Sequence, residues 1–476
     1  MDLVISLDGT GEKTVRVYRA LREAIEDGRL PAGHRLPATR ALAGDLGVSR
    51  NSVATAYERL VAEGYLSARV GAGTYVAPLR TRPARRRAAA DPLRPRPGWD
   101  LIPLPVSSDE RTPRYDFRTG IPDAGLFPFD TWRRLVAAEV RLRANSPGTY
   151  ADPAGHPALR AAIARYLGVA RSIRAAAEDV LVTNGTQHGL DLVARVTLRP
   201  GDVVAVEDPG YPPARRLFAS LGARVAGVPV DSEGLVVDAL PGNARLVYVT
   251  PSHQFPLGPA MSLARRHALL DWARGRQAGI VEDDYDSEFR FSARPLEPLY
   301  GLDTGGRVLY LGTFSKTMLP TVRTGFLLAP PSMRPALLAA RQVGDGFGQL
   351  PVQAALARFI DEGQLARHVR RAAKAYRDRH ARIVAALTAE PDLRVLPSAA
   401  GLHVTALLTD GGPERAGRVV AAAAAAGVVL DDLAMYAGPG QDSVRQTAGF
   451  VFGFGAVRPD RIEAGVAVFA ARLRQE

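Results

Sequence analysis

The feature that most constrains the fold of this chain is a segment rich in proline and arginine between Arg80 and Asp100. It carries seven arginines against two aspartates, with prolines spaced through it. Sequence of this kind stays extended and solvated, because proline blocks regular hydrogen bonding and like charges repel. We therefore expect two separately folded parts, a front domain over residues 1–78 and a back domain over residues 115–476, joined by a linker over residues 79–114.

The composition of the 476-residue chain excludes several classes of protein. Cysteine is absent, which rules out disulfides, thiolate metal sites and cysteine nucleophiles and is compatible with a reducing compartment. The first residues lack the basic and then apolar layout of a secretory signal, and the longest apolar run, residues 419–430, is too short to span a bilayer. We expect a cytoplasmic protein that has no membrane partner.

The front domain begins with two helical patterns. Within residues 15–27, apolar residues recur at i, i+4, i+7 and i+8 from Val17, as on one face of an amphipathic helix. A shorter pattern covers residues 40–46 and stops at Gly47, a residue type that commonly follows the last turn of a helix. These patterns predict two helices separated by a turn.

A third helix and a hairpin follow. Ser49 can cap this helix, which leaves Arg50, Asn51 and Ser52 exposed in its first turn. Residues 65–76 alternate around a Gly-Ala-Gly turn, as the two strands of a hairpin do. The order predicts a winged helix-turn-helix, in which the first turn of the second motif helix enters the major groove of DNA and wing glycines approach the minor groove. The alternative is a three-helix domain that contacts another protein through the same polar turn.

Several short motifs of the front domain point to one family. They are Gly28-Arg29-Leu30, Arg35-Leu36-Pro37, Leu46-Gly47-Val48-Ser49-Arg50, Glu63-Gly64-Tyr65 and Gly71-Ala72-Gly73-Thr74-Tyr75-Val76. With these motifs, residues 15–77 resemble the GntR family of winged-helix regulators. The resemblance implies that the DNA contacts are made by Arg40, Ser49, Arg50, Asn51, Ser52 and Gly71. Many family members carry a further arginine in the recognition helix where this chain has Ala54, which predicts one contact fewer.

The back domain alternates short apolar strands with amphipathic helices. This pattern predicts an α/β fold with a mainly parallel sheet, whose ligands bind at the carboxyl ends of the strands. Three predicted strand ends carry polar clusters. The first, Asn-Gly-Thr-Gln at residues 184–187, precedes an apolar helix from about Gly189. Backbone amides at a helix N-terminus can bind a phosphate, although Asn-Gly is also an ordinary turn.

The second cluster follows the apolar residues 278–281 and contains Glu282, Asp283, Asp284 and Asp286 around a tyrosine. Several carboxylates together can bind magnesium or calcium. Alternatively, one aspartate can pair with a protonated pyridine nitrogen while the tyrosine donates a hydrogen bond to a phenolate oxygen.

The third cluster contains a lysine, and lysine is rare in this chain. Of the 61 Lys and Arg residues only Lys13, Lys316 and Lys374 are lysines, so chemistry that needs an ε-amine has three candidates. Lys316 comes just after the strand pattern Arg307-Val-Leu-Tyr-Leu311, where a lone lysine is unusual.

Hydroxyls and a guanidinium lie near that lysine in the sequence. Thr313 and Ser315 flank it, and Arg323 follows seven residues later. A phosphate cup, a carboxylate, a tyrosine, a lysine and an arginine together are the parts of a pyridoxal 5′-phosphate (PLP) site. The metal interpretation of the acidic cluster leaves Lys316 without a role.

From about residue 115 the chain resembles the fold-type I aminotransferases, in residues 150–155, 184–187, 208–211, 251–258, 282–285 and 313–323. The resemblance implies that Lys316 is the catalytic, cofactor-bound lysine, that Asp283 pairs with the pyridinium nitrogen and that Tyr285 bonds the phenolate oxygen. Tyr211 would stack on the ring. The phosphate would be held by Gly185, Thr186, Gln187, Thr313 and Arg323, with Tyr150 reaching it from the neighbouring subunit, which implies a homodimer.

Two departures from the aminotransferase pattern bear on activity. Phe255 stands where those enzymes have an asparagine that contacts the ring oxygen. No arginine lies within the apolar strand expected over residues 449–455, where many of them bind the substrate carboxylate; Arg445 and Arg458 only flank it. These departures predict cofactor binding without sustained turnover, and leave a transaminase half-reaction open.

A GntR-like domain, a linker and an aminotransferase-like body in this order resemble the MocR-type transcriptional regulators over nearly the whole chain, and Gln254-Phe255-Pro256 is similar to that group. The resemblance implies a homodimer that binds PLP and double-stranded operator DNA with repeated half-sites. It would sense PLP itself, or an amine or amino acid, through aldimine chemistry at Lys316, and closure of a smaller C-terminal α+β portion would move the DNA-binding domains. No metal is expected. The alternative is a working PLP-dependent aminotransferase with an accessory DNA-binding domain.

Overall fold

The computed structural model describes residues 12–69, 73–78, 113–141, 148–291, 297–438 and 448–476, with the single residues 7, 94 and 99. The chain divides into two compact units, residues 1–97 and residues 98–476. The expected linker over residues 79–114 lies almost entirely outside the described residues. Among the described residues, none of the helices combines the length and the apolar composition that crossing a bilayer requires.

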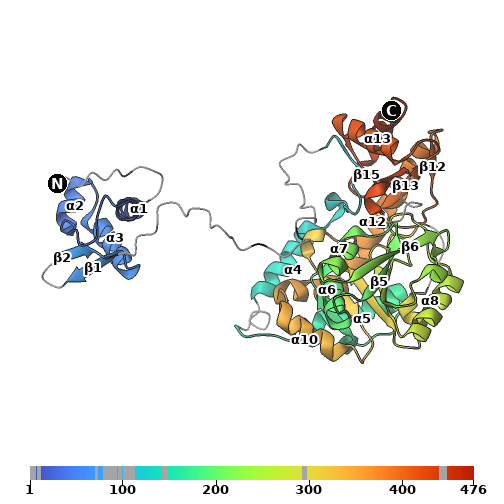
Figure 1. Ribbon diagram of the computed structural model, residues 1–476, viewed down its shortest axis with the longest axis horizontal. Helices are drawn as coiled ribbons and strands as arrows, with labels where there is room; N and C mark the ends of the chain where they lie inside the picture. Colours follow the sequence, from blue (N-terminus) through green and yellow to red (C-terminus); the bar gives the residue numbers. More distant parts are fainter. Residues whose placement is uncertain are drawn as a thin grey trace. The chain divides into compact units, whose positions relative to one another are not determined.

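The first unit is a winged helix-turn-helix, as predicted (Figure 1). Its elements are α1 (Lys13–Glu26), α2 (Thr39–Asp45), α3 (Arg50–Ala62), β1 (Leu66–Arg69) and β2 (Gly73–Val76). The strands β1 and β2 pair antiparallel. The apolar faces of the three helices meet in one small core around Leu21, Leu42 and Leu60, which are each 0% exposed.

Two local signals in this unit act as expected. The backbone amide of Ser52 donates a hydrogen bond to Ser49 Oγ over 3.0 Å, so Ser49 caps α3. Gly47, in the turn between α2 and α3, has φ of 61°, a conformation that glycine adopts without strain.

The second unit is built around an eight-stranded sheet with the order β4-β11-β10-β9-β8-β5-β6-β7. The strands are β4 (Val180–Thr183), β5 (Val203–Asp208), β6 (Arg224–Asp231), β7 (Gly234–Leu235), β8 (Ala244–Val249), β9 (Gly279–Asp284), β10 (Val308–Thr313) and β11 (Gly325–Leu328). The five central strands, from β10 to β6, pair in parallel, whereas β11 and β7 run antiparallel to their neighbours. The predicted mainly parallel sheet is confirmed.

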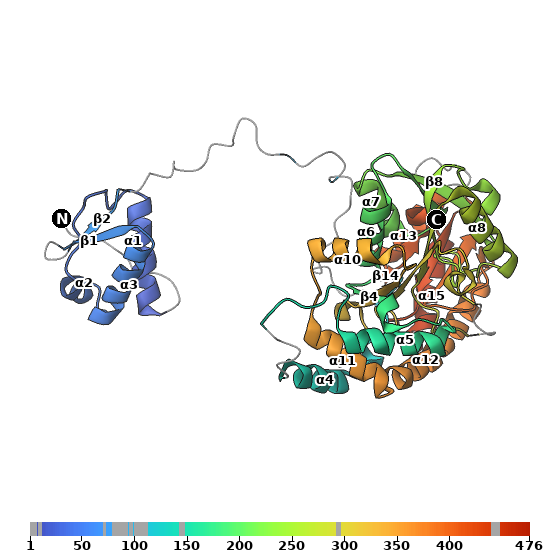
Figure 2. The same ribbon diagram turned by 90° about the horizontal axis from the view of Figure 1, so that it is seen from below.

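Helices cover both faces of this sheet (Figures 1 and 2). Alternate residues of each strand pack to opposite sides: Val204 and Val206 lie in one core, and Val203 and Ala205 in another. The helices around the sheet are α4 (Phe129–Arg141), α5 (Pro157–Arg171), α6 (Thr186–Thr197), α7 (Pro212–Ser220), α8 (Leu263–Arg276), α9 (Leu299–Leu302), α10 (Arg334–Gly344) and α11 (Leu350–Asp361). Burial on both faces explains why these strands read as continuous apolar runs.

A smaller α+β portion follows, as expected. Its sheet has the order β12-β13-β16-β15, entirely antiparallel, and a short parallel pair joins β14 to β3. These elements are α12 (Gln364–Thr388), β12 (Leu393–Val395), β13 (His403–Leu408), α13 (Pro413–Ala425), β14 (Val428–Val429), β15 (Asp431–Asp432), β16 (Gly449–Gly453), α15 (Ile462–Leu473) and, from the start of the unit, β3 (Tyr115–Asp116).

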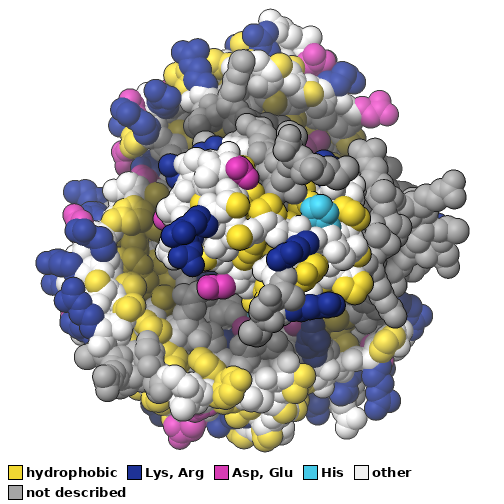
Figure 3. Space-filling view, turned by 90° about the vertical axis from the view of Figure 1, so that its left-hand side faces the viewer, with side chains coloured by type: hydrophobic (Ala, Val, Ile, Leu, Met, Phe, Trp, Pro, Cys, Tyr) yellow, Lys and Arg dark blue, Asp and Glu magenta, His cyan; other side chains and the backbone are white. Residues whose placement is uncertain are grey.

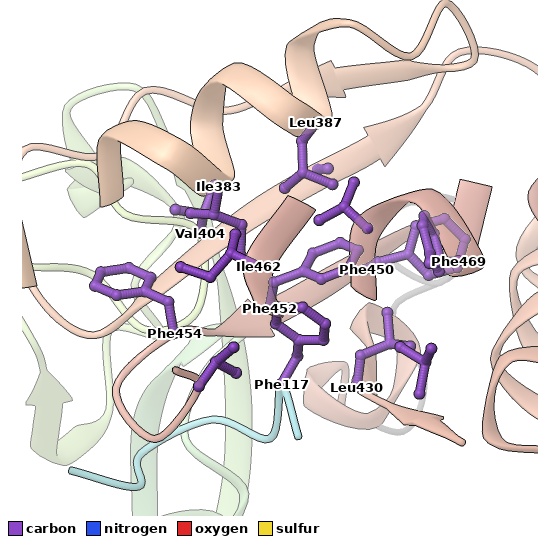
Figure 4. Close-up of a cluster of buried hydrophobic side chains, with 14 of the residues drawn as sticks. Phe117, Ile383, Leu387, Val404, Leu430, Phe450, Phe452, Phe454, Ile462 and Phe469 are labelled. Atoms are coloured by element: carbon purple, nitrogen blue, oxygen red, sulfur yellow. The ribbon is translucent and has the colours of Figure 1, made fainter. Parts of the chain in front are cut away.

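The core of the C-terminal portion is aromatic (Figure 4). Phe450 and Phe452 of β16 each pack edge-on against Phe469 of α15, with ring centroids 5.0 Å apart in both pairs. Phe117, from the beginning of the unit, packs against Phe452 at 5.8 Å. The segment that opens the unit is therefore held by the portion that closes it.

Candidate functional site

Three strand ends meet at one edge of the large sheet. β9 and β10 are parallel neighbours, and β4 runs in the same direction as β10 because β11 lies antiparallel between them. The polar clusters after these strands line one cavity of about 370 Å³. Of the predicted cofactor residues, it brings together Gly185, Thr186, Gln187, Tyr211, Asp283, Tyr285, Thr313, Lys316 and Arg323.

The acidic cluster is divided by the alternation of a strand. β9 continues through Asp284, three residues beyond the apolar run that ended the strand expected from the sequence. Glu282 accepts hydrogen bonds from the backbone amides of Leu299 and Tyr300, over 3.0 and 2.8 Å. Asp284 forms a buried ion pair with Arg171 on the same side. Of the three acidic residues of β9, only Asp283 lines the cavity; Asp286, just beyond the strand, lines it as well.

Asp283 is a buried carboxylate, and one of its oxygens has no hydrogen-bond partner among the described residues. Its Oδ2 accepts a hydrogen bond from the hydroxyl of Tyr248 over 2.7 Å, whereas Oδ1 is buried and has no partner among the described residues. Burial raises the pKa of Asp283 to about 7, although the Tyr248 hydrogen bond opposes the shift. An unpartnered buried carboxylate oxygen is costly unless a ligand completes it. A protonated ring nitrogen is such a ligand.

The Lys316 amine lies in the same cavity. Its Nζ donates a hydrogen bond to the carbonyl oxygen of Gly120 over 2.6 Å. Burial lowers the pKa of this amine, while the carboxylates of Asp286 and Asp283 act in the opposite direction. A lowered pKa favours the neutral amine, which is the nucleophilic form.

The phosphate end of the cavity is formed by the start of α6. Gly185 is the N-cap, with φ of 85°, and Thr186 and Gln187 form the first turn, so the helix begins three residues before the expected Gly189. Arg323 takes a left-handed backbone, φ 50°, which is uncommon outside glycine, and its Nη1 lies 3.8 Å from where a Cβ at Gly185 would be. Amides at a helix N-terminus beside a guanidinium suit a dianion.

Aromatic rings form another wall. Tyr211 and Tyr285 each lie edge-on to Phe255, with ring centroids 5.9 and 6.0 Å apart. Phe255, the residue in place of the aminotransferase asparagine, also contacts the ring of His403 at 5.2 Å. Its ring offers no hydrogen bond to a ligand, so this wall is apolar.

One predicted residue lies away from the cavity, and several wall residues were not predicted. Tyr150 does not line the cavity of its own chain, and its side chain is 94% exposed. The sequence analysis missed the roles of Tyr248 and Gly120, which bond Asp283 and Lys316. No local pattern could have revealed them, because the contacts depend on strand pairing and on a residue 196 positions away in the chain.

The metal interpretation does not fit the acidic cluster, because Glu282 and Asp284 are already bonded on the other side of β9. Among the described residues, the group that could hold a metal ion is His253, Asp286 and His403.

The predicted DNA contacts fall in the first unit. Arg40, Ser49, Arg50 and Asn51 are exposed, whereas Ser52 is half-buried and its hydroxyl lies 2.9 Å from that of Ser49. The structure gives no hydrogen bond or ion pair from the side chain of Arg40 or Arg50 to any described residue. Gly71 lies outside the described residues.

On the face shown in Figure 3, basic side chains lie among apolar and acidic ones.

The expected carboxylate-binding arginine is also absent from the described part of the chain. β16, where aminotransferases often carry it, contains none. Arg458 is exposed and paired with Asp460 over 2.9 Å, and Arg445 lies outside the described residues. Arg323 is the only arginine among the described residues that line the cavity.

Comparison with known proteins identifies both units. The family model for bacterial regulatory proteins of the gntR family matches residues 13–76, and the model for aminotransferase class I and II matches residues 123–442. The chain is 42% identical over 390 residues to the probable rhizopine catabolism regulatory protein MocR of Rhizobium meliloti, which covers 80% of this chain and 78% of that protein. It is 34% identical over 465 residues to the HTH-type pyridoxine biosynthesis transcriptional regulator PdxR of Corynebacterium glutamicum, covering 97% and 96%.

Among solved structures, a kynurenine aminotransferase of Pyrococcus horikoshii in complex with PMP is similar, with a TM-score of 0.70 and 26% identity over 79% of this chain and 96% of that one. The aminotransferase class I and II fold is a PLP-dependent fold.

Proposed function

Because the chain belongs to the MocR-type transcriptional regulators, which join a GntR DNA-binding domain to an aminotransferase-like domain, we propose that it binds PLP at Lys316 and couples the state of that site to DNA binding. One observation carries this proposal. The Lys316 amine, the unpartnered Oδ1 of Asp283 and the start of α6 all line the same cavity.

The donor set of the cavity fits PLP. Asp283 would hold the ring nitrogen in its protonated form, and Tyr285 would bond the ring oxygen. Tyr211 would cover the ring face. The phosphate would be held by Gly185, Thr186, Gln187, Thr313 and Arg323. When bound, the cofactor supplies an aldehyde that reacts reversibly with primary amines. Lys316 is the amine positioned for it, and an effector amine would compete with Lys316.

Regulation is favoured over transamination. The two relatives compared above are named as a regulatory protein and a transcriptional regulator, and the GntR domain implies DNA binding. Arg323 is the only arginine among the described wall residues and is assigned to the phosphate, so no second guanidinium of this wall remains for an α-carboxylate. The apolar ring of Phe255 further reduces hydrogen bonding to a substrate. Sustained turnover of an amino acid with a keto acid would favour the alternative of a working aminotransferase.

A homodimer is supported by exposed apolar residues on one side of the second unit. Phe129 and Val140 of α4 are 54% and 56% exposed, and Val343 is 88% exposed. Two adjoining hollows there share Val136 and residues 348–349. Exposed apolar surface of this kind marks protein interfaces. A dimer would place Tyr150 near the partner's phosphate site and would bind repeated DNA half-sites in the cytoplasm.

The scarcity of lysine gives a sharp test of the cofactor assignment. Incubation of the full chain with PLP should produce visible absorbance from the lysine-bound cofactor, and Lys316→Ala should abolish that absorbance. The matched control is Lys374→Ala, which removes an exposed lysine of α12 and should leave the spectrum unchanged. A wild-type spectrum from Lys316→Ala would show that the lysine assignment is wrong.

A further inference from the structure

Behind the Tyr285 hydroxyl lies a buried histidine. The hydroxyl is 3.0 Å from Nδ1 of His253 and 3.0 Å from the His253 carbonyl oxygen. The same Nδ1 is 3.1 and 3.3 Å from the two carboxylate oxygens of Asp286. His253 and Asp286 are each 1% exposed. The histidine thus connects a cofactor-facing tyrosine with a buried carboxylate.

The hydrogen-bond partners of His253 define whether each of its ring nitrogens donates or accepts. The Ser398 hydroxyl donates to the carbonyl oxygen of Ala400 over 3.0 Å, so its oxygen must accept from His253 Nε2, which is 3.2 Å away. A carboxylate only accepts, so Nδ1 must donate to Asp286. Both ring nitrogens are then donors, one to the Asp286 carboxylate and the other to the Ser398 hydroxyl oxygen. The Tyr285 hydroxyl donates to the His253 carbonyl oxygen, and the ring oxygen of a bound cofactor would compete for that single proton.

The C-terminal portion packs directly on this pair. A Cβ at Gly401 would lie 2.2 Å from His253 Cε1 and 2.4 Å from Asp286 Oδ2, so only glycine fits there. The ring of His403, at the start of β13, lies 4.8 Å from the ring of His253. Contact this close means that the C-terminal portion cannot shift without altering the surroundings of the pair.

Hydrogen bonds already engage the ring nitrogens that a metal ion would need. Nδ1 of His253 is 3.1 Å from Asp286 Oδ2, and its Nε2 is 3.2 Å from the Ser398 hydroxyl. Nε2 of His403 is moreover 3.0 Å from the carbonyl oxygen of Pro256, where it donates a hydrogen bond.

We propose that His253 and Asp286 form a positioning pair that links the C-terminal portion, through Ser398 and Gly401, to the Tyr285 hydroxyl. The pair would transmit the position of that portion to the cofactor's ring oxygen, so that effector-driven closure and the ionisation of the bound cofactor depend on each other. Other titratable or charged groups face the pair or the Tyr285 hydroxyl: Lys316, Asp283 from β9, Glu207 from β5, Arg290, His380 from α12 and His403 from β13. This inference rests on the proposed cofactor site.

The test is the pH profile of the visible absorbance of the PLP-loaded full chain. His253→Gln and Asp286→Asn should each move the midpoint of that profile by about one pH unit, the scale of a lost charge contact. The double variant should move it no further than either single variant, because both changes break one pair. Ser398→Ala, a milder change at a half-buried position, should move the midpoint in the same direction by a smaller amount.

Two controls separate the possible failures. His267→Gln changes an exposed histidine of α8 and should leave the profile unchanged. If the wild-type chain shows no visible cofactor band, the proposed function fails. If the wild-type band is present but the variants at His253, Asp286 and Ser398 keep its pH profile, the positioning pair is wrong while the cofactor site stands. Additive shifts in the double variant would also overturn the pair.

Discussion

At the scale of single residues, the cofactor cavity depends on one carboxylate whose neighbours leave it incomplete. Asp283 is bonded by Tyr248 through one oxygen and by no described residue through the other. Glu207 and Glu282, buried nearby, also have pKa values raised to about 7 by burial. Backbone amides bond both oxygens of Glu282, and Glu207, whose Oε1 has no partner among the described residues either, does not line the cavity. Asp283 is therefore the acid of this group that a ligand can complete.

The raised pKa of Asp283 predicts how stability changes with pH in the cofactor-free protein. The folded state holds this proton to a pH of about 7 and the unfolded state only to about 3.8, so the free energy of unfolding falls as pH rises between the two values. The Asp283→Asn variant has no carboxyl group to titrate here, so its free energy of unfolding should not fall in this way. Above pH 7 it should exceed that of the wild type by ~2–4 kcal/mol, since one pKa unit corresponds to about 1.4 kcal/mol.

Denaturant unfolding of cofactor-free wild type and Asp283→Asn at several pH values measures this difference. Because Glu207 and Glu282 are present in both proteins, their contributions cancel in the comparison. Stability curves that stay parallel from pH 4 to pH 8 would contradict the assignment of a buried, proton-holding Asp283.

A second residue prediction concerns DNA. Arg50 is exposed at the start of α3 and makes no ion pair with a described residue, so its guanidinium is free to contact a base edge. Arg50→Ala should weaken specific binding by about 1–3 kcal/mol. Arg19→Ala removes the same charge from an exposed position of α1 and should have a smaller effect. Fluorescence anisotropy with specific and scrambled duplexes measures both, and equal losses in the two variants would remove Arg50 from the recognition surface.

At the scale of secondary-structure elements, the start of α3 has two separable roles. Ser49 caps the helix through the Ser52 amide, and the resemblance to GntR regulators places it among the expected DNA contacts. Ser49→Ala removes the cap and should destabilise α3 by about 1 kcal/mol. Ser49→Asn and Ser49→Asp both retain capping, but only the aspartate adds a negative charge that DNA phosphates repel.

Amide hydrogen exchange of α3 in the full chain reports the capping effect, and anisotropy reports binding. We expect Ser49→Asn to preserve both, Ser49→Ala to lower protection, and Ser49→Asp to lower affinity alone. Equal DNA affinities for the asparagine and aspartate variants would mean that this helix end does not face DNA.

Elements governed by local signals could be predicted from the sequence. The three helices and the hairpin of the first unit follow from apolar spacing, a cap and glycine turns. The start of α6 and the end of β9 could not be placed, because polar residues there obscure the pattern. Glu282 and Asp284 remain in a buried strand only because Leu299, Tyr300 and Arg171, all distant in the sequence, satisfy them.

At the scale of the whole molecule, α12 connects the two cores of the second unit. Leu365 near its start packs in the core with α5 and α11, whereas Tyr376, Ile383 and Leu387 pack in the aromatic core of the C-terminal portion (Figure 4). A rigid helix shared by both cores can carry a change at the cavity to the C-terminal portion. Such coupling shifts an equilibrium only by the difference in ligand affinity between its two states.

In the proposed function, the chemical state at Lys316 sets the affinity of the protein for DNA. The most direct measurement is fluorescence anisotropy of the gene's own upstream DNA with the full chain in three states: cofactor-free, PLP-loaded, and PLP-loaded with hydroxylamine, an amine that competes with Lys316. Salt must be constant, because phosphate contacts make affinity depend on it. We predict that at least two states differ by about 1–3 kcal/mol and that Lys316→Ala removes the response to hydroxylamine. Equal affinity in all three states would contradict the claim.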